Sequence, residues 1–457
     1  MKAKVQVVIE SEHGQFIVHD VATITRSTVS AGTLGLTLAE GKNLLQNLQS
    51  SIVNQQVSEW LRVTRDCPIC GSPRSLKGHH SLVCRTVFGR VELDSPRLRH
   101  CPCEKAEHCS FSPLSKRLSE RTTPELAYLE AKWASLMSYG LTVEILSEVL
   151  PLEGQVNTTS VRRQVERVAD RAEQAMGPEK GIYLEGMERD WGKLPRPEEP
   201  ITVGIDGGFV RGRDGNSRGE GHFEVIAGKS IAENDSKCFA YVTRYDEKPK
   251  RRLYEVLKSQ GMQMNQQVTF LSDGAENVRT LQYDLNPQAE YILDWFHITM
   301  RLTVMRQMAK GLPNEENPKA TEKAMDHLRR IKWYLWHGNV YRAMQAVEDL
   351  TWHLDCLEPS EVQTKLFKTV GEFERYIQSN QMNITNYGYR YRNGERISTG
   401  FVESTINQVV SKRFVKKQQM RWTERGAHLL LQVRTKVLND QLRDTFEEWY
   451  PEMKEAA

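Results

Sequence analysis

Two aspartates each end a run of apolar residues and stand directly before a glycine. Asp206 closes the run ITVGID before Gly207-Gly208, and Asp273 closes the run QVTFLSD before Gly274. We expect both apolar runs to form buried strands. Ligands of open α/β sheets bind at the carboxyl ends of such strands, which is where the two aspartates would lie. Two carboxylates that close repel each other unless a cation lies between them, and Mg²⁺ prefers oxygen ligands. The pattern predicts that Asp206 and Asp273 bind Mg²⁺ (or Mn²⁺) together.

A third carboxylate would allow two metal ions to be held with open positions, and the sequence offers two candidates. Asp294 ends the expected strand AEYILD, and Glu403 lies in the first turn or so of a helix that Ser398 or Thr399 can cap. Each Asp-Gly pair alone also suits an ordinary turn after a strand. The combination with Glu403 favours a site with two metal ions, which act together on phosphodiesters.

Asp294 stands in the apolar stretch YILDWFHI, three residues before His297. Burying an unpaired carboxylate costs several kcal/mol, so this charge needs a metal ion, a partner or water. We expect Asp294 to line the same crevice, and His297 to donate to a phosphate or to orient Asp294. The alternative is a satisfied Asp-His pair that only fixes the end of the strand.

Basic residues crowd the segment that follows Glu403. Eight lysines and arginines stand against the single acid Glu424 between residues 412 and 436: Lys412, Arg413, Lys416, Lys417, Arg421, Arg425, Arg434 and Lys436. Cationic side chains grip the phosphates that neighbour a reacting phosphodiester. We predict DNA contacts for the first five of them, with Arg413 reaching along the helix groove from Glu403.

Six of the eight cysteines fall between residues 67 and 109. The pairs Cys67-Pro-Ile-Cys70 and Cys101-Pro-Cys103 flank two expected strands, which is the arrangement of a zinc ribbon. We therefore predict a structural Zn²⁺ bound by these four thiolates. Five other residues remain alternatives for one ligand position: Cys84, Cys109, His79, His80 and His100. The alternative to any metal site is a set of free thiols.

Two further groups of residues suggest contacts with nucleic acid. Arg163, Arg167 and Arg171 recur every four residues along one face of an expected helix, where they could contact phosphates or only be solvated. Three tryptophans in the later helical region could stack on a flipped base, although helical core packing is the alternative: Trp333, Trp336 and Trp352.

The elements that must position these residues can be followed along the chain. VQVVI and QFIV alternate as hairpin strands in the first 30 residues, and residues 44–61 carry apolar side chains at helical spacing. After the proline-rich segment 192–200, three hairpin-like strands precede alternating strands and helices. This order predicts a mixed sheet flanked by helices. Residues 298–394 follow as a helical region.

Size and composition set limits on the class of protein. The chain has 457 residues, enough for several domains, and its net charge of +3 permits a DNA partner without requiring one. It contains no run of eighteen apolar residues, and its first residues do not have the pattern of a signal peptide. We expect a cytoplasmic, nucleoid-associated protein with no membrane partner.

Motifs along nearly the whole chain resemble those of DDE transposases of bacterial insertion sequences, most closely the Kra-type group, distantly related to Mutator-like transposases. In order they are CPICG, FGRVELDSPRLRHCPC, FSPL with PELAYLEAKWASLMSYG, VGIDGGFV, FLSDGAENV, ILDWFHI, and STGFVESTINQVVSKRF with MRWTERGAHLLLQVR. The resemblance implies a ribonuclease H-like core with the acidic triad Asp206, Asp273 and Glu403. It also implies that Asp294 and His297 form the Asp-x-x-His signature of related transposases.

The expected fold class is therefore multidomain α+β, in which a mixed sheet is interrupted by an all-helical insertion. The expected domains are an N-terminal hairpin and helix (1–64), a zinc ribbon (65–115), a helix-turn-helix-like DNA-binding region (116–191), a linker (192–200), a ribonuclease H-like core (201–297 and 397–457) and the helical insertion (298–396).

The resemblance also implies an activity and partners. A transposase binds the terminal inverted repeats of its element, cleaves double-stranded DNA at the ends and joins the 3′ ends to target DNA by two-metal-ion phosphoryl transfer. We expect a homodimer or a higher assembly on DNA, because two ends must be handled together. The alternatives are an inactive, transposase-derived DNA-binding protein and a ribonuclease H-like nuclease that cuts without joining.

Overall fold

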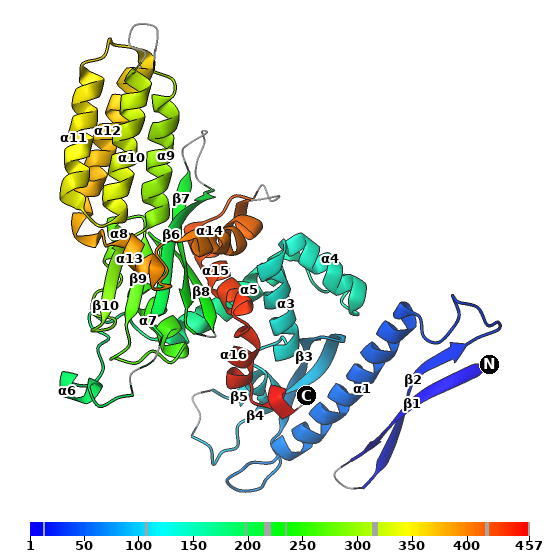
Figure 1. The fold of residues 1–457 in the computed structure, drawn as a ribbon. Helices are drawn as coiled ribbons and strands as arrows, with labels where there is room; N and C mark the ends of the chain where they lie inside the picture. Colours follow the sequence, from blue (N-terminus) through cyan, green and yellow to red (C-terminus); the bar gives the residue numbers. More distant parts are fainter. Residues whose placement is uncertain are drawn as a thin grey trace. The chain divides into compact units, whose positions relative to one another are not determined.

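The computed structural model describes residues 1–11, 14–105, 108–195, 197, 199–213, 221–233, 235–312, 319–415 and 420–455 (Figure 1). The chain divides into two compact units, residues 1–168 with 440–457, and residues 169–439. The division falls inside the helix α5 and not in the proline-rich segment 192–200, and the last eighteen residues belong with the first unit.

The first unit is built from two small antiparallel sheets and helices. Its elements are β1 (Lys2–Glu10), β2 (Phe16–Thr25), α1 (Leu38–Thr64), β3 (Leu76–Thr86), β4 (Gly89–Arg99), β5 (Ser110–Phe111), α2 (Pro113–Arg117), α3 (Pro124–Leu136), α4 (Tyr139–Val149), the first part of α5 (Thr158–Met176), α16 (Leu442–Trp449) and α17 (Glu452–Glu455). The predicted hairpins are confirmed, because β1 pairs with β2, and β3 pairs with β4 across the turn at Phe88-Gly89.

The second unit is a five-stranded sheet with a group of long helices. Its elements are α6 (Glu188–Trp191), β6 (Ile201–Arg211), β7 (His222–Ile231), β8 (Ser236–Val242), α7 (Pro249–Ser259), β9 (Val268–Ser272), α8 (Glu276–Arg279), β10 (Ala289–Leu293), α9 (Trp295–Ala309), α10 (Ala320–Trp336), α11 (Val340–Asp355), α12 (Glu361–Ser379), a 3₁₀ turn (Gln381–Asn383), α13 (Tyr387–Arg392), α14 (Gly400–Ile406), a π-helix (Asn407–Val415) and α15 (Glu424–Leu438).

The sheet is mixed, as the order of strand and helix patterns predicts. Its strand order is β10-β9-β6-β7-β8, in which β7 pairs antiparallel with both β6 and β8, while β9 and β10 run parallel to β6. Alternate residues of β6 face opposite sides, and Ile201, Val203 and Ile205 join the buried core that includes side chains of α7. The even-numbered residues of β6 therefore face the other side, where α14 lies.

Helices α9 to α12 pack side by side in one group that extends away from the sheet (Figure 1). Their buried leucines, isoleucines and alanines form a core that continues into Ile292 and Leu293 of β10. Within the described part of residues 298–396, all regular structure is helical, so the predicted helical region is confirmed there.

Candidate active site

Three aspartates lie at one level across three neighbouring strands. Gly204 of β6 pairs with Leu271 of β9, and Ser272 of β9 pairs with Leu293 of β10. Continuing these registers along the strands places Asp206 beside Asp273, and Asp273 beside Asp294. Neighbouring strands are about 4.8 Å apart. The carboxylates therefore form a row, as the sequence predicts.

The electrostatics of Asp206 agree with this arrangement. Burial raises the pKa of Asp206 above its ordinary value, and the charges of Asp273 and Asp294 raise it further, whereas the backbone N–H of Gly207 and the nearby His297 act in the opposite direction. Like charges held together in this way favour a bridging cation. The row therefore fits a divalent metal ion bound by oxygen.

Asp206 lies in the middle of β6 and not at its end, so this part of the prediction was wrong. The strand continues through Gly207-Gly208 to Arg211 because these residues pair with β7. A run of apolar residues indicates which part of a strand is buried. In β6 the continuous burial ends at Ile205, whereas the extended backbone continues to Arg211. Because β9 ends at Ser272, Asp206 still lies beyond the end of that neighbouring strand.

Glu403 is carried over the same face of β6 by α14. A Cβ atom at Gly204 would lie 2.2 Å from Cγ2 of Val402, and one at Gly208 would lie 3.5 Å from Cγ2 of Ile406. Asp206 stands between these two glycines on the same face of the strand, and Glu403 follows Val402 in sequence on the helix. The glycines thus let the helix approach closely. Glu403 is exposed, and no hydrogen bond in the described part of the chain joins it to an aspartate.

Asp294 is fully buried, and its carboxylate is satisfied by hydrogen bonds from neighbouring residues. Oδ1 accepts hydrogen bonds from the backbone N–H of Phe296 (2.9 Å) and of Thr399 (3.0 Å). Oδ2 accepts from the Thr399 hydroxyl and lies 2.7 Å from Nδ1 of His297. Asp294 begins α9 and Thr399 begins α14. Four hydrogen bonds from three residues leave this carboxylate little capacity for a metal ion, and they join the starts of the two helices.

His297 is half-buried beside the row of aspartates. Burial lowers the pKa of His297, but the hydrogen bond to Asp294 and the charges of Asp206 and Asp273 outweigh it and raise this pKa above its ordinary value. A protonated His297 would offset part of the negative charge of the crevice. It is also able to donate a hydrogen bond to a phosphate.

The basic residues after Glu403 divide by burial. Lys412 and Arg421 are exposed, as DNA contacts require, whereas Lys416 and Lys417 lie outside the described residues. Arg413 differs from the prediction, because it is fully buried with its Cζ 5.2 Å from the centre of a Trp422 ring. A side chain enclosed in this way packs the π-helix against the β6 side of the unit and does not reach DNA.

The arginine stripe on α5 is present with the predicted spacing. Arg163 and Arg167 are exposed, and Arg171 is half-buried. A solvated face and a phosphate-contacting face have the same geometry here, so the DNA contacts of these arginines stay a prediction.

The four predicted cysteines gather as a candidate metal centre. The Sγ atoms of Cys67, Cys70, Cys101 and Cys103 all lie within 4.8 Å of one another, and that of Cys70 is 3.5 Å from those of Cys101 and Cys103. With Zn–S bonds of about 2.3 Å, a tetrahedral zinc ion separates its sulfurs by about 3.8 Å. The set fits Zn²⁺. The residues considered as alternative ligands lie outside this cluster. Cys84 is buried in β3, and three histidines form hydrogen bonds elsewhere: His79 with Asp94, His80 with Ser115, and His100 with Glu104.

The thiols also influence one another's titration. Hydrogen bonds from Ser72 lower the pKa of Cys70 to about 6, whereas neighbouring Cys101 and Cys67 raise the pKa of Cys103. The raised pKa of Cys103 reflects the crowding of the thiols, because each thiolate that forms makes the next one harder to form without a cation. A divalent metal removes this conflict.

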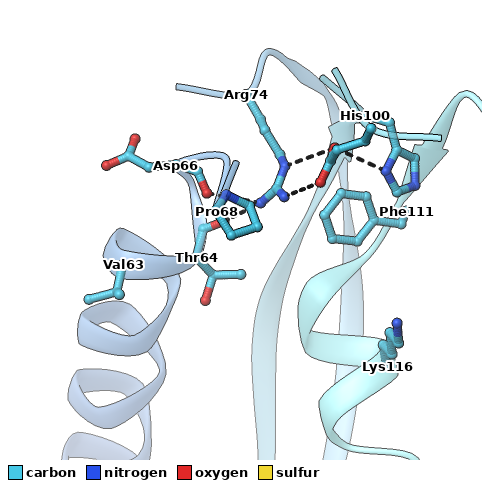
Figure 2. Close-up of a pocket in the computed structure, with 9 residues that line it drawn as sticks. Val63, Thr64, Asp66, Pro68, Arg74, His100, Phe111 and Lys116 are labelled. Carbon is cyan, nitrogen blue, oxygen red and sulfur yellow. Dashed lines mark hydrogen bonds and ion pairs between the residues drawn. The ribbon is translucent and has the colours of Figure 1, made fainter. Parts of the chain in front are cut away.

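A buried ion pair holds the two cysteine turns together (Figure 2). Arg74 bonds to Glu104 and donates from Nη1 to the carbonyl oxygen of Thr64 at 3.0 Å, while Glu104 accepts from the backbone N–H of Cys101 at 2.7 Å. Such outer contacts fix the direction of metal ligands. A cavity of about 440 Å³ lies beside this pair.

We expect the purified chain to contain one zinc ion, and Cys67→Ser to lose it, because three thiolates no longer complete a structural site. Metal analysis after exhaustive dialysis measures this. Cys109→Ser is the matched control, since Cys109 is an exposed thiol outside the cluster. Zinc retained at full occupancy in Cys67→Ser would contradict the assignment.

A second group of potential metal ligands in the same unit as the sheet already has a cation. Glu173, Asp246 and His428 lie close together, but Arg252 occupies the space between them. Its Nη1 is 2.8 Å from Oε1 of Glu173, and its Nε is 2.9 Å from Oδ2 of Asp246. We therefore assign no metal there. Sequence reasoning missed this network, because its members are far apart in the chain and no local pattern connects them.

The network makes stability depend on pH. Burial alone would raise the pKa of Glu173, but His428 and Arg252 lower it from 4.5 to about 2. The stabilisation is fully present above the ordinary value of 4.5 and is lost as the pH falls toward about 2.

Comparisons with known proteins add little to this geometry. No protein-family model and no curated protein matches the chain. Among solved structures, it matches one titled "Crystal structure of NurA" with 15% identity over 56% of this chain and 74% of that chain, and with a TM-score of 0.12. A score this low carries no argument about fold or function. Among the described helices, none is long and apolar enough to cross a membrane.

Proposed function

We propose that the chain is a metal-dependent DNA transposase of the DDE type. It would bind the terminal inverted repeats of an insertion sequence, cleave DNA at the element ends and join the 3′ ends to target DNA. One observation carries the proposal, namely the strand registers that put Asp206 and Asp273 side by side under the helix that bears Glu403.

The order of the strands supports a ribonuclease H-like core. Within this sheet three antiparallel strands come first in sequence, and two strands parallel to the first of them are added on its other side. This is the arrangement that the resemblance to DDE transposases implies. The helical group between β10 and α14 occupies the place expected for the insertion.

Each residue of the proposed active site would have its own role. Asp206, Asp273 and Glu403 would hold two Mg²⁺ (or Mn²⁺) ions, which supply activation of water and stabilisation of the leaving 3′ oxygen. Asp294 would position the starts of α9 and α14, and the His297 imidazolium would donate to a phosphate near the crevice.

Binding would rest on separate elements. Lys412 and Arg421 would contact phosphates near the site, and Arg163, Arg167 and Arg171 would contact phosphates of the inverted repeat. The zinc ribbon would be structural. A homodimer or higher assembly is the expected active form, because both ends of the element react with one target.

The test uses labelled duplex DNA that carries the ends of the element encoding this chain. We expect strand cleavage at the element end with Mg²⁺ and none with EDTA. Duplexes already cut at the 3′ end should then be joined to a plasmid, whereas the same duplex with a terminal 3′-deoxy nucleotide should not. Cleavage without any joining would support a nuclease instead, and no cleavage with Mg²⁺ or Mn²⁺ would contradict both.

A further inference from the structure

The strand β1 has one edge that pairs with no strand in the described part of the chain. There β1 and β2 form a sheet of two strands, and an isolated pair of strands is only marginally stable in water. The helix α1 covers β2, because Nδ2 of Asn47 donates to the carbonyl oxygen of Val21 at 3.0 Å. β2 therefore lies between α1 and β1, and the outer edge of β1 stays open (Figure 1).

The open edge of β1 lacks most of the features that keep strands from pairing. It runs for nine residues without proline or glycine, and the bulge of the hairpin falls on β2, where Val21 is left out of the pairing. A long, regular edge of this kind is a template for another strand. Lysines on an edge discourage pairing, but β1 has Lys2 and Lys4 near one end and Glu10 at the other.

One face of the hairpin is apolar and only partly covered. Alternate residues of β1 point to this face, opposite residues of β2 that are mostly apolar as well: Ala3 with Ile24, Val5 with Ala22, Val7 with His19, and Ile9 with Ile17. None of these eight residues is buried. On the opposite face the paired Val8 and Val18 are 59% and 55% exposed. A further strand beside β1 would cover apolar surface on both faces.

We propose that β1 pairs antiparallel with β1 of a second copy of the chain. One antiparallel register pairs all nine residues, and it places Gln6 opposite the partner's Gln6 on a two-fold axis. On the apolar face Val5 then lies opposite the partner's Val7. The two pairs would form one sheet of four strands, which is the size at which a sheet with an apolar face becomes stable.

The charges of β1 select a second copy over an unrelated strand. In the same register Lys2 lies opposite the partner's Glu10, and Glu10 lies opposite the partner's Lys2. Opposite charges that face each other across two strands stabilise the pairing, and like charges destabilise it. The edge is thus complementary to itself. This surface deepens the proposed function, because it defines where the expected homodimer forms, and it needs neither DNA nor metal.

Charge reversal tests the two ends of the pairing. Sedimentation equilibrium of the full chain without DNA should give twice the mass of one chain. Lys2→Glu and Glu10→Lys should each weaken the dimer about tenfold, because each places like charges opposite each other at both ends. An equimolar mixture of the two variants should dimerise like the parent chain, since all facing charges are then opposite. Glu92→Lys is the matched control, because Glu92 is an exposed acid on β4.

A disulfide tests the register. Gln6→Cys would place two thiols opposite each other on the two-fold axis, whereas Lys4→Cys would place them about 13 Å apart along the strands. Mild oxidation should therefore cross-link the first variant above the level of the parent chain, and not the second. The two variants are matched, because Gln6 and Lys4 are both exposed and both contact Asp20.

Three results would overturn the pairing of β1: a monomeric parent chain, a dimer that neither charge reversal weakens, or equal cross-linking of the two cysteine variants. Recovery of the dimer in the mixture would show that both charge variants are folded. Failure of the proposed function would be a different result, namely the lack of metal-dependent cleavage by a chain whose oligomeric state is known from these measurements.

Discussion

Asp273→Asn abolishes DNA cleavage in our expectation, with a loss of about 1,000-fold or more in the single-turnover rate. The substitution removes a negative ligand from the proposed pair with Asp206, and metal stabilisation of the reacting phosphate is worth several kcal/mol. The fold should persist, because the Oδ1 of Asp273 accepts one hydrogen bond, from the backbone N–H of Ala275 at 3.0 Å, which an asparagine oxygen also accepts. The variant should therefore lose cleavage activity but still bind DNA.

The matched control for Asp273→Asn is Glu348→Gln, which removes one negative charge from an exposed position on α11. It should cleave at the parent rate. Anisotropy measured with the same duplex in EDTA confirms that both variants bind DNA. If Asp273→Asn cut DNA as fast as the parent chain, Asp273 would have to be removed from the active site and the metal mechanism with it.

The row of aspartates shows what local sequence predicts well. The apolar runs before Asp206, Asp273 and Asp294 identified three buried strands, and the parallel pairing of β9 with β6 and of β10 with β9 agrees with the alternation of strands and helices. The sequence could not predict the register between β6 and β9, because it depends on backbone pairing between segments about 65 residues apart. A signal for the α14 contact was present, since glycines two residues before and after Asp206 leave one face of β6 without side chains.

Burial of the basic residues was the part that sequence could not supply. Lys412 and Arg413 are neighbours with the same charge, yet one is exposed and the other fully buried against Trp422. Successive residues of a helix point in different directions, so within the π-helix Asn407–Val415 one of two neighbours can face inward while the other faces solvent. Counting charges along a segment detects a cationic composition but not the face on which each charge lies.

The cysteine cluster was predicted more completely because its information is local. Each pair of thiols sits on a short turn, and Gly71 adopts a φ of +72° directly after Cys70, which a glycine tolerates. Only the pairing of the two turns is long-range, and the β3–β4 hairpin between them supplies it. Two short motifs joined by one hairpin therefore determine a site that four scattered residues would not.

Arg252→Met should destabilise the chain by about 3–5 kcal/mol, the usual cost of removing one partner from a buried ion pair. Arg252 is 7% exposed, and without it Glu173 and Asp246 would remain as neighbouring carboxylates with no cation between them. Urea unfolding followed by tryptophan fluorescence measures the loss. Arg251→Met is the matched control, since Arg251 pairs with the partly exposed Glu255 and should cost about 1 kcal/mol or less. Equal losses in the two variants would mean that the network contributes no more than a surface pair. A large difference would show that Arg252 links the end of α5 to α7 and α15 in the unit that contains the sheet.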